Sequence, residues 1–299
     1  MKKIRGTDMA HMPIDKGDMM PVFNFPAAGL WLRRLREWRF RRGAVIHGRY
    51  RILKRLGEGS YGVTYLCEDR RHGSYCVLKR ICPARGGRSR ARRVFEQETR
   101  IMAKLPARQF PKLLSRFTCG QESCFTMDYV QGQSLEQLLF QEEAAFSEKH
   151  SLSLILQLLA VVEELHRLRI IHRDISISNL ILSGESLALI DFGLARELSE
   201  SHSEPLPGDD VWPDDPLDKQ LRRRIDVTSD FYAVGHLLLF LLYSMYPDTD
   251  EEAQRSWENE LTLHPGTKKL LRRLLLAEQP YASAGQIIDD IRHILRSIG

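Results

Sequence analysis

The chain has 299 residues, enough for one large or two modest domains with a sizeable core. Apolar residues make up 43% of it and charged residues 28%, which is ordinary for a soluble globular protein. No apolar run approaches the roughly 20 residues that span a bilayer, and the basic N-terminus lacks the apolar core of a secretory signal. These absences predict a cytoplasmic protein.

The five cysteines form no Cys-x-x-Cys pair and no Cys/His zinc spacing. Cys119 and Cys124 flank an expected hairpin turn and could approach each other. An odd number of cysteines in a chain of cytoplasmic type nevertheless favours free thiols over a disulfide framework.

The net charge of +5 is concentrated in an N-terminal extension, residues 1–43, which has ten basic and four acidic side chains. A helix is expected over residues 27–40, and one of its faces carries Trp31, Leu32, Leu35 and Trp38. A basic amphipathic helix suits an acidic partner, either an anionic membrane surface or a nucleic acid. Contact with such a surface would place the protein peripherally at the membrane. The alternative is that the apolar face docks on the chain's own folded domain.

A glycine-rich segment joins two expected strands. Apolar and polar residues alternate over residues 50–56, which is typical of a strand. Gly57, Gly59 and Gly62 follow, and the β-branched and aromatic residues of 63–66 predict a second strand. In a dinucleotide-binding fold a helix would begin at these glycines. The sequence instead predicts a hairpin whose backbone N–H groups can approach phosphates without obstruction by Cβ atoms.

A third strand, residues 75–79, ends in Lys79, and a helix with an apolar stripe follows it. The stripe contains Val94, Phe95, Ile101, Met102 and Leu105. On a helical wheel Glu98 falls inside this stripe and Glu96 on the opposite face. A carboxylate on an inward face is costly unless it is paired, so Glu98 is predicted to pair with Lys79 and Glu96 to lie at the surface. The arginine-rich residues 85–93 before the helix are expected to form a mobile loop, either solvated or an anchor for a phosphorylated or acidic segment.

Three oxygen-bearing side chains stand in order around another expected hairpin. The sequence Ile-Ile-His-Arg-Asp ends in Asp174, and Asn179 and Asp191 follow. The apolar runs at residues 180–182 and 187–190 are typical of short buried strands. Hard oxygen ligands on loops suit Mg²⁺ that carries a substrate phosphate. An ordinary polar turn would explain one aspartate but not this ordered set.

The C-terminal half is predicted to be mainly helical. Residues 151–168 are strongly apolar at helical spacing, which predicts a buried helix. Two further helices are expected over residues 267–277 and 283–298.

The order of these motifs resembles the protein kinase family, specifically bacterial Ser/Thr kinases of eukaryotic type. The resemblance covers about residues 44–299 and implies an α+β fold of two lobes. The N-lobe, residues 44–130, would be small and β-rich with one helix, and the C-lobe, residues 131–299, would be larger and mainly α-helical. The resemblance also implies transfer of the γ-phosphoryl group of ATP, with Mg²⁺ or Mn²⁺, to serine and threonine hydroxyls of proteins, the chain itself included.

The resemblance assigns residues to this reaction. Asp174 would orient the attacking hydroxyl or accept its proton, and Lys79, paired with Glu98, would hold the α- and β-phosphates. Asn179 and Asp191 would hold the metal ion. The nucleotide would be bound by Leu56, Gly57, Glu58, Gly59, Ser60, Tyr61, Gly62, Thr64, Val77, Lys79, Met127, Asp128, Val130 and Ile181.

Other positions are given supporting roles by the resemblance. His172 would support the loop by packing and hydrogen bonding. Arg173 would bind an anionic group of the activation segment, residues 194–229. Asp230 would brace the backbone of the catalytic loop. Backbone groups of Asp128 and Val130 would meet the adenine edge.

Several positions depart from the family pattern. Thr64 and Val77 replace the usual Val and Ala beside adenine. Ser176 stands where Ser/Thr kinases carry a lysine that meets the γ-phosphate, which reduces charge stabilisation in the loop. Residues 217–219 replace Ala-Pro-Glu, and Tyr281 replaces the arginine that pairs with that glutamate. Both ends of one buried ion pair are thus missing together, which need not destabilise the fold.

These departures leave two alternatives to an active protein kinase: a nucleotide-binding pseudokinase or scaffold, and a small-molecule kinase built on the same lobes. The activation segment, residues 194–229, is acidic, and this acidity is expected to substitute in part for phosphate. Ser199, Ser201 and Ser203 are candidate autophosphorylation sites. The sequence predicts neither the physiological substrate nor the oligomeric state.

Overall fold

The structure is a computed structural model that describes residues 37–59, 62–82, 87–200, 215–246 and 256–298. The chain divides into two compact units, Met1–Arg41 and Arg42–Gly299. Of the amphipathic helix expected over residues 27–40, the described part is a helical turn at residues 37–39 with Trp38 exposed. The role of this helix therefore stays a prediction.

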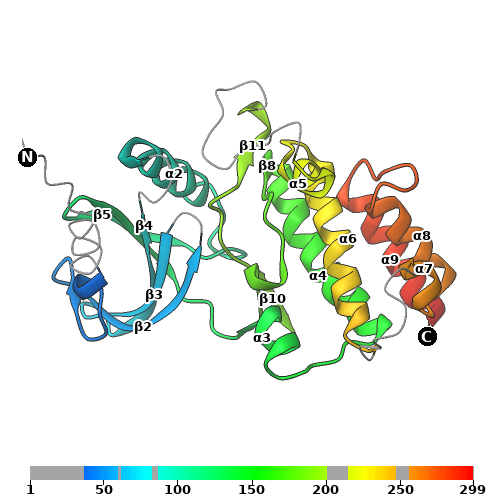
Figure 1. Ribbon diagram of the computed structural model, residues 1–299, viewed down its shortest axis with the longest axis horizontal. Helices are drawn as coiled ribbons and strands as arrows, with labels where there is room; N and C mark the ends of the chain where they lie inside the picture. Colours follow the sequence, from blue (N-terminus) through cyan, green and yellow to red (C-terminus); the bar gives the residue numbers. More distant parts are fainter. Residues whose placement is uncertain (1–36, 60–61, 83–86, 201–214, 247–255, 299) are drawn as a thin grey trace, which may run out of the picture. The chain divides into compact units, whose positions relative to one another are not determined.

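The second unit begins with an antiparallel sheet, coloured blue to green in Figure 1. Its six strands run in the order β1-β2-β3-β4-β6-β5. They are β1 (Val45–Ile46), β2 (Tyr50–Gly59), β3 (Gly62–Asp69), β4 (Ser74–Ile81), β5 (Leu113–Cys119) and β6 (Glu122–Asp128). Alternation explains β3, in which Val63, Tyr65 and Cys67 are buried and the residues between them are partly exposed. The glycines of the predicted hairpin lie in the paired ends of β2 and β3, where Gly59 pairs with Gly62.

Helix α2 (Gly87–Met102) packs against β4 and β6 of this sheet (Figure 1). Its buried face includes Val94, Ile101 and Met102. The predicted loop over residues 85–93 is wrong from Gly87 onward, where the helix begins. Arginine is a good helix former, and an i,i+4 ion pair between Arg92 and Glu96 supports the exposed face.

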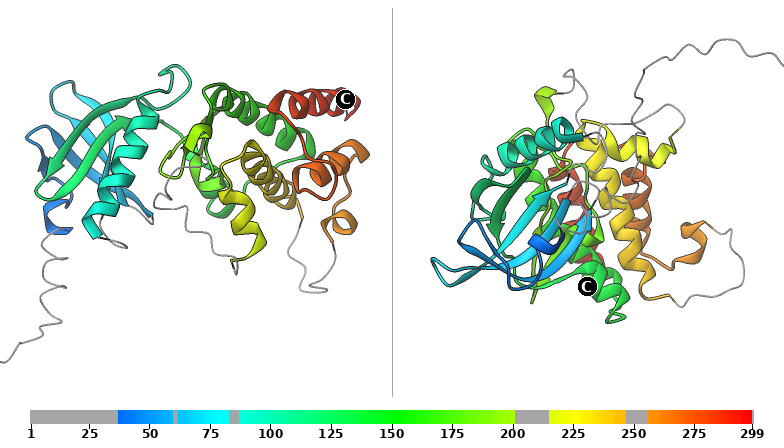
Figure 2. Two further views of the ribbon diagram at one scale, coloured as in Figure 1. Left: turned by 90° about the horizontal axis from the view of Figure 1, so that it is seen from above. Right: turned by 60° about the vertical axis from the view of Figure 1, so that its left-hand side comes forward.

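The C-lobe is built around two long helices, α4 (Glu148–Arg167) and α6 (Val227–Tyr243), which pack against each other. The three predicted helices are present as α4, α8 (Pro265–Leu274) and α9 (Ala284–Ile298). Figure 2 shows α9 beside α4 on one side and α8 beside α6 on the other. Shorter helices complete the lobe: α3 (Leu135–Phe140), α5 (Leu217–Arg223) and α7 (Trp257–Glu260). The α+β architecture with a β-rich N-lobe and a helical C-lobe is thus confirmed.

Short strands fix the loops that carry the polar motifs. β8 (Ile170–Ile171) pairs with β11 (Arg196–Glu197). β9 (Leu180–Ser183) pairs with both β10 (Ser186–Leu189) and β7 (Gln133–Ser134). The Ile190 amide donates to the Asn179 carbonyl at 2.9 Å, which extends the predicted hairpin by one bond. Because the hairpin closes there, Asn179 and Asp191 emerge from the same end of it.

All five cysteines are free thiols, as predicted. Three of them are buried, and burial raises the pKa of the Cys76 thiol to about 11 and that of Cys67 to about 12. Such thiols are poorly reactive near neutral pH. Among the described residues, no helix is both long and apolar enough to cross a membrane.

Candidate active site

A cavity of about 730 Å³ lies between the sheet and the C-lobe. Asp174, Asn179 and Asp191 line it together with residues of β2, β3 and β4. Of the residues predicted to bind nucleotide, the cavity wall contains Leu56, Gly57, Glu58, Gly59, Gly62, Thr64, Val77, Lys79, Met127, Asp128, Val130 and Ile181. Ser60 and Tyr61 lie outside the described residues. The expected nucleotide positions and the three oxygen-bearing side chains therefore share one space.

Several residues of the cavity wall are not among those predicted from the sequence: Pro111, Tyr129, Glu136, Gln137, Gln141 and Ile190. Strand alternation would have found Ile190, since Leu189 is buried in the C-lobe core and the next side chain faces the other way. Glu136 and Gln137 lie on α3, which no local sequence pattern connects with the site.

The glycines of the hairpin have different roles. A Cβ atom on Gly62 would lie 2.3 Å from the Arg80 carbonyl oxygen, so the close approach of β3 and β4 requires glycine there. A Cβ atom on Gly59 would meet nothing within 4 Å, which leaves its backbone open toward the cavity. Thr64, which stands where the family usually has valine, donates its hydroxyl to the Gly57 carbonyl at 3.3 Å. Its extra polar group is thereby satisfied.

Lys79 connects two carboxylates from distant parts of the chain. Its Nζ donates to Glu98 Oε1 at 2.7 Å and to Asp191 Oδ1 at 2.7 Å. The pairing of Lys79 with Glu98 that the helical wheel predicts is thus present, and Glu96 is exposed as expected. The side chains of Lys79 and Glu98 are 7% and 1% exposed, whereas that of Asp191 is 38% exposed.

This arrangement leaves one cation to balance two acids. Burial disfavours the charged form of Lys79, but attraction to Asp191 and Glu98 outweighs it, and the pKa of Lys79 is raised. Burial raises the pKa of Glu98, against the opposing effect of Lys79. Burial also acts to raise the pKa of Asp191, but Lys79 and the Gly193 amide outweigh it, so the pKa of Asp191 is lowered. Asp191 is therefore the carboxylate that stays ionised and faces the cavity.

Gly193 lies next to the ion cluster of Lys79, Glu98 and Asp191. A Cβ atom at this position would lie 3.2 Å from Asp191 Oδ1, 3.4 Å from Lys79 Nζ and 3.6 Å from Glu98 Oε2. The Gly193 amide donates to Asp191 Oδ1 at 3.0 Å. Glycine thus allows the backbone to approach the ion cluster and to hold Asp191 in place.

The catalytic loop is held by a buried carboxylate. Asp230, at the start of α6, accepts the backbone N–H groups of His172 and Arg173 at 3.0 and 2.8 Å. His166 lies 2.9 Å from the same carboxylate. The bracing of the loop that the resemblance implied for Asp230 is present. Burial acts to raise the pKa of Asp230, but the contact with His166 and the backbone bonds outweigh it, and the pKa is lowered.

Inside the loop Asn179 orients Asp174. The Asn179 Nδ2 donates to the Asp174 carbonyl at 2.9 Å and to its carboxylate Oδ2 at 3.0 Å. Arg173 and Asp191 have positive φ angles of 63° and 62°, which are uncommon for residues other than glycine. Strained backbone of this kind concentrates at functional sites where the surrounding structure enforces it. Here the enforcing contacts are those of Asp230 and Gly193.

His172 and Arg173 are both buried. The His172 ring contacts Phe192 edge-on, with ring centroids 5.1 Å apart. Arg173 donates to the Leu194 carbonyl at 3.4 Å and to the Arg223 carbonyl. Residues 201–214 of the activation segment, including Ser201 and Ser203, lie outside the described residues, so the anion expected for Arg173 stays a prediction.

The donor set fits a divalent metal ion that is shared with a phosphate. Among the described residues, no group of three or more His, Cys, Asp or Glu side chains could hold a metal by itself. Lys79 and Gly193 both donate to Oδ1 of Asp191, so neither occupies the second oxygen of this partly exposed carboxylate. One carboxylate and one amide oxygen, completed by phosphate oxygens and water, are the ligands that Mg²⁺ takes in phosphate-binding sites.

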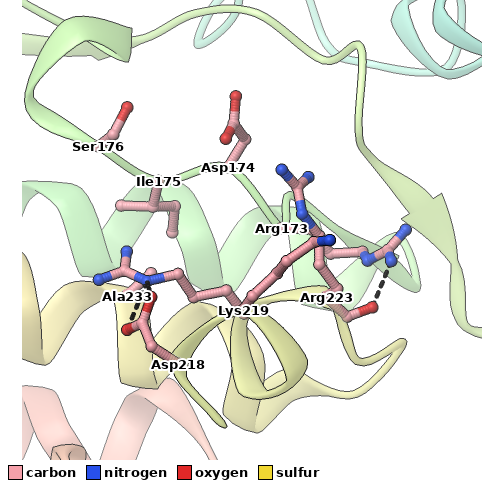
Figure 3. A pocket seen from close by; sticks show the side chains of 9 residues that line it. Arg173, Asp174, Ile175, Ser176, Asp218, Lys219, Arg223 and Ala233 are labelled. Carbon is pink, nitrogen blue, oxygen red and sulfur yellow. Dashed lines mark hydrogen bonds and ion pairs between the residues drawn. The ribbon is translucent and has the colours of Figure 1, made fainter. Parts of the chain in front are cut away.

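A second cavity of about 230 Å³ is lined by residues 173–176 of the catalytic loop and by helix α5. Figure 3 shows its lining, to which the loop contributes Asp174 and Ser176 and helix α5 contributes Lys219 and Arg223. The Ser176 hydroxyl lies 3.0 Å from the Ser178 hydroxyl. Because both side chains are neutral, neither brings a positive charge to this part of the loop.

Lys219 and Tyr281 stand at the two positions where the resemblance would place a buried ion pair, and both have other partners here. Lys219 Nζ lies 2.8 Å from the Asp215 carboxylate, close to the surface. Tyr281 is buried, and its hydroxyl donates to Asp290 Oδ2 at 2.6 Å. The Arg273 guanidinium stacks on the Tyr281 ring 3.6 Å from its centroid. A hydrogen-bonded tyrosine thus stands at the position that the resemblance equates with the family's arginine.

Comparison with known proteins gives one consistent picture. The family model described as "Protein kinase domain" matches residues 50–296. A probable serine/threonine-protein kinase of Bacillus subtilis, YbdM, is 32% identical over 256 residues, which cover 86% of this chain and 93% of that protein. Serine/threonine-protein kinase D of Synechocystis is 34% identical over 274 residues, which cover 83% of this chain but 53% of that protein. This chain therefore spans about half the length of that relative.

Solved structures agree on the fold. The crystal structure of the PknI kinase domain of Mycobacterium tuberculosis superposes with a TM-score of 0.62. The match covers 85% of this chain and 98% of that domain at 21% sequence identity.

Proposed function

This chain belongs to the protein kinase domain family and is a serine/threonine protein kinase, and we propose that the cavity between its lobes is where phosphoryl transfer takes place. The kinase uses ATP and a divalent metal ion, as the family does, and we propose that the ion is Mg²⁺. The observation that carries this proposal is the closed cluster of Lys79, Glu98 and Asp191 in the same cavity as Asp174 and Asn179. Phosphoryl transfer needs positioning and charge neutralisation, and this cluster provides both.

Each residue has a separate task in the proposed reaction. Lys79, fixed by Glu98, binds the α- and β-phosphates, and the hairpin between β2 and β3 covers them. Asn179 and Asp191 hold the metal ion, which neutralises phosphate charge when it is bound. Asp174 orients the acceptor hydroxyl and takes its proton, and the hydrogen bond from Asn179 fixes its carboxylate for that task.

The acceptor class can be tested directly. The full chain is incubated with γ-labelled ATP, Mg²⁺ and a generic protein acceptor such as casein, and the label is traced to individual amino acids. The proposal predicts labelled phosphoserine and phosphothreonine in the acceptor, in the chain itself, or in both. A chain that binds ATP but leaves all protein unlabelled would contradict it. The two alternatives, a scaffold or a small-molecule kinase, are not favoured by relatives that are named serine/threonine-protein kinases.

We further propose that the basic N-terminal extension contacts an anionic partner. Its ten basic and four acidic side chains carry the excess positive charge of the whole chain. Deletion of residues 1–43 should then remove binding to anionic vesicles or to DNA, and added salt should weaken the binding of the full chain. Equal binding by the full and the shortened chains would contradict this proposal.

A further inference from the structure

The two cavities meet at three residues. Asp174, Ser176 and Arg223 line both the larger cavity between the lobes and the smaller cavity between the catalytic loop and α5. Asp174 is the proposed base, and Ser176 occupies the position where the family has a lysine. Arg223, the last residue of α5, is far from both in sequence but lines the same pocket (Figure 3). A cation therefore stands at the junction where the loop itself provides none.

Arg223 differs from the other cations of the smaller cavity in its partners. Arg222 pairs with Asp218 at 3.0 Å, and Lys219 pairs with Asp215 at 2.8 Å. Arg173 donates to backbone carbonyls, one of which belongs to Arg223. In the part of the chain that the structure describes, the Arg223 Nη1 is buried without a hydrogen-bond partner, and no carboxylate pairs with its guanidinium.

A buried guanidinium nitrogen without a partner is costly, and an anionic ligand would relieve that cost. Arg223 is partly buried, and its backbone carbonyl accepts a hydrogen bond from Arg173 of the catalytic loop, so its backbone is held beside that loop before any ligand binds. A guanidinium also keeps its proton at any working pH. These properties are those of a fixed positive charge that awaits an anion.

We propose that Arg223 supplies to the transferred phosphoryl group the positive charge that Ser176 cannot supply. The inference rests on the proposed function of the cavity. In the reaction the bond from the γ-phosphorus to the bridging oxygen breaks, and a bond to the acceptor hydroxyl oxygen forms. The electron pair leaves with ADP, and the hydroxyl proton passes to Asp174. Arg223 stabilises the charge on the phosphoryl oxygens during this transfer and exchanges no proton.

The test combines removal of the charge with its return at the family's usual position. Arg223→Gln should lower kcat by about 10²-fold, the usual effect of losing one stabilising contact to the transition state. Introducing Ser176→Lys into that variant should restore at least about a tenth of the wild-type kcat. Lys at position 176 would not repair a purely structural defect at Arg223. The neighbouring Arg224→Gln is the matched control, since Arg224 is exposed and lines neither cavity.

A binding measurement separates this inference from the proposed function. Calorimetry with Mg²⁺ compares ADP with a non-hydrolysable ATP analogue whose β- and γ-phosphates are bridged by nitrogen. Arg223→Gln should lower the affinity for the analogue about tenfold and leave the affinity for ADP unchanged, because ADP lacks the γ-phosphate. Unchanged kcat together with unchanged analogue affinity would overturn the role of Arg223 alone. Absence of transfer by the wild type would overturn the proposed function, and the analogue affinity would then decide the role of Arg223 by itself.

Discussion

At the scale of single residues, the site depends on one buried cation shared by two acids. Lys79 is 5% exposed and lies 2.7 Å from oxygens of both Glu98 and Asp191. Removing one member of a buried ion pair leaves its partner charged and unpaired, which costs more than the pair itself contributes. The cluster therefore affects stability as well as phosphate binding.

Lys79→Met should lower the free energy of unfolding by about 3 kcal/mol and abolish detectable phosphoryl transfer. The loss follows because two carboxylates then share a buried space without a cation. Urea denaturation checks the stability, with Lys112→Met as the matched control, since Lys112 is exposed. A Lys79→Met protein as stable as the control would show that the cluster does not act as a charged unit.

The lowered pKa of Asp230 predicts that the stability of the protein depends on pH. Its pKa is lowered in the folded protein, so the unfolded chain binds the proton more readily than the folded chain. The contribution of Asp230 is therefore fully present above about pH 4, the ordinary value for aspartate, and is lost as the pH falls toward its lower folded pKa.

Asp230→Asn should accordingly be less stable than the wild type at pH 6, and the difference should shrink as the pH is lowered below about 4. Chemical denaturation over a pH series measures this. Asp226→Asn is the control, since Asp226 is exposed and only caps α6. A difference that stays constant across the series would contradict the lowered pKa of Asp230.

The sequence could predict the residues of the site that carry a local pattern. Lys79 closes a strand, Glu98 falls in an apolar stripe, and Asp174, Asn179 and Asp191 surround a hairpin. Arg223 could not be predicted, because it is one of three consecutive arginines and only the packing of α5 brings it to the catalytic loop. The need for glycine at position 62 likewise comes from the Arg80 carbonyl on the neighbouring strand.

At the scale of elements, α2 is connected to the start of the activation segment. Arg100 Nε of α2 lies 3.8 Å from the carboxylate of Glu197 on β11, and the Nζ of Lys104, which follows the end of α2, lies 2.7 Å from the same carboxylate. Gln97 donates to the Ala195 carbonyl at 3.4 Å. Since α2 carries Glu98, the placement of β11 and the formation of the ion cluster are connected through one helix.

Glu197→Gln should therefore loosen α2 without unfolding the protein. The lysine and arginine partners are about half exposed, so the cost in stability should stay below about 1 kcal/mol. Amide hydrogen exchange in α2 should become faster, and kcat should fall by about threefold to tenfold. Arg92→Gln is the matched control, because Arg92 pairs with Glu96 on the exposed face of the same helix. Unchanged exchange in α2 would contradict the connection.

The elements show where sequence patterns succeed and where they fail. Strands β2 and β3 and helices α4, α8 and α9 follow from alternation and helical spacing, because each buries residues of one face. Strand β4 does not alternate, since its residues from Cys76 to Ile81 are all buried. The start of α2 does not follow from the sequence pattern, since glycine and many like charges around Arg88 suggest a loop. The intrinsic helix preference of arginine and the Arg92–Glu96 pair decide otherwise.

At the scale of the whole molecule, the site is assembled by the fold from distant parts of the chain. Lys79 and Asp191 are 112 residues apart in sequence, and His172 and Asp230 are 58 apart. The fold brings residues of β2, β3 and β4, which are proposed to bind the nucleotide, into one cavity with Asp174, Asn179 and Asp191. One buried hydrophobic cluster runs from Met127 of the sheet through Phe192 to the helices of the C-lobe. Resemblance to a family could predict this assembly, whereas local pattern alone could not.

The most direct test of the account compares the wild type with Asp174→Asn for both transfer and binding. We expect kcat for transfer from ATP to a protein acceptor to fall by about 10³-fold in Asp174→Asn, because the carboxylate that accepts the hydroxyl proton is gone. ATP affinity should be nearly unchanged, since Lys79 and the hairpin of β2 and β3 are intact. Equal transfer by Asp174→Asn and the wild type would show that the chemistry takes place elsewhere or by other means.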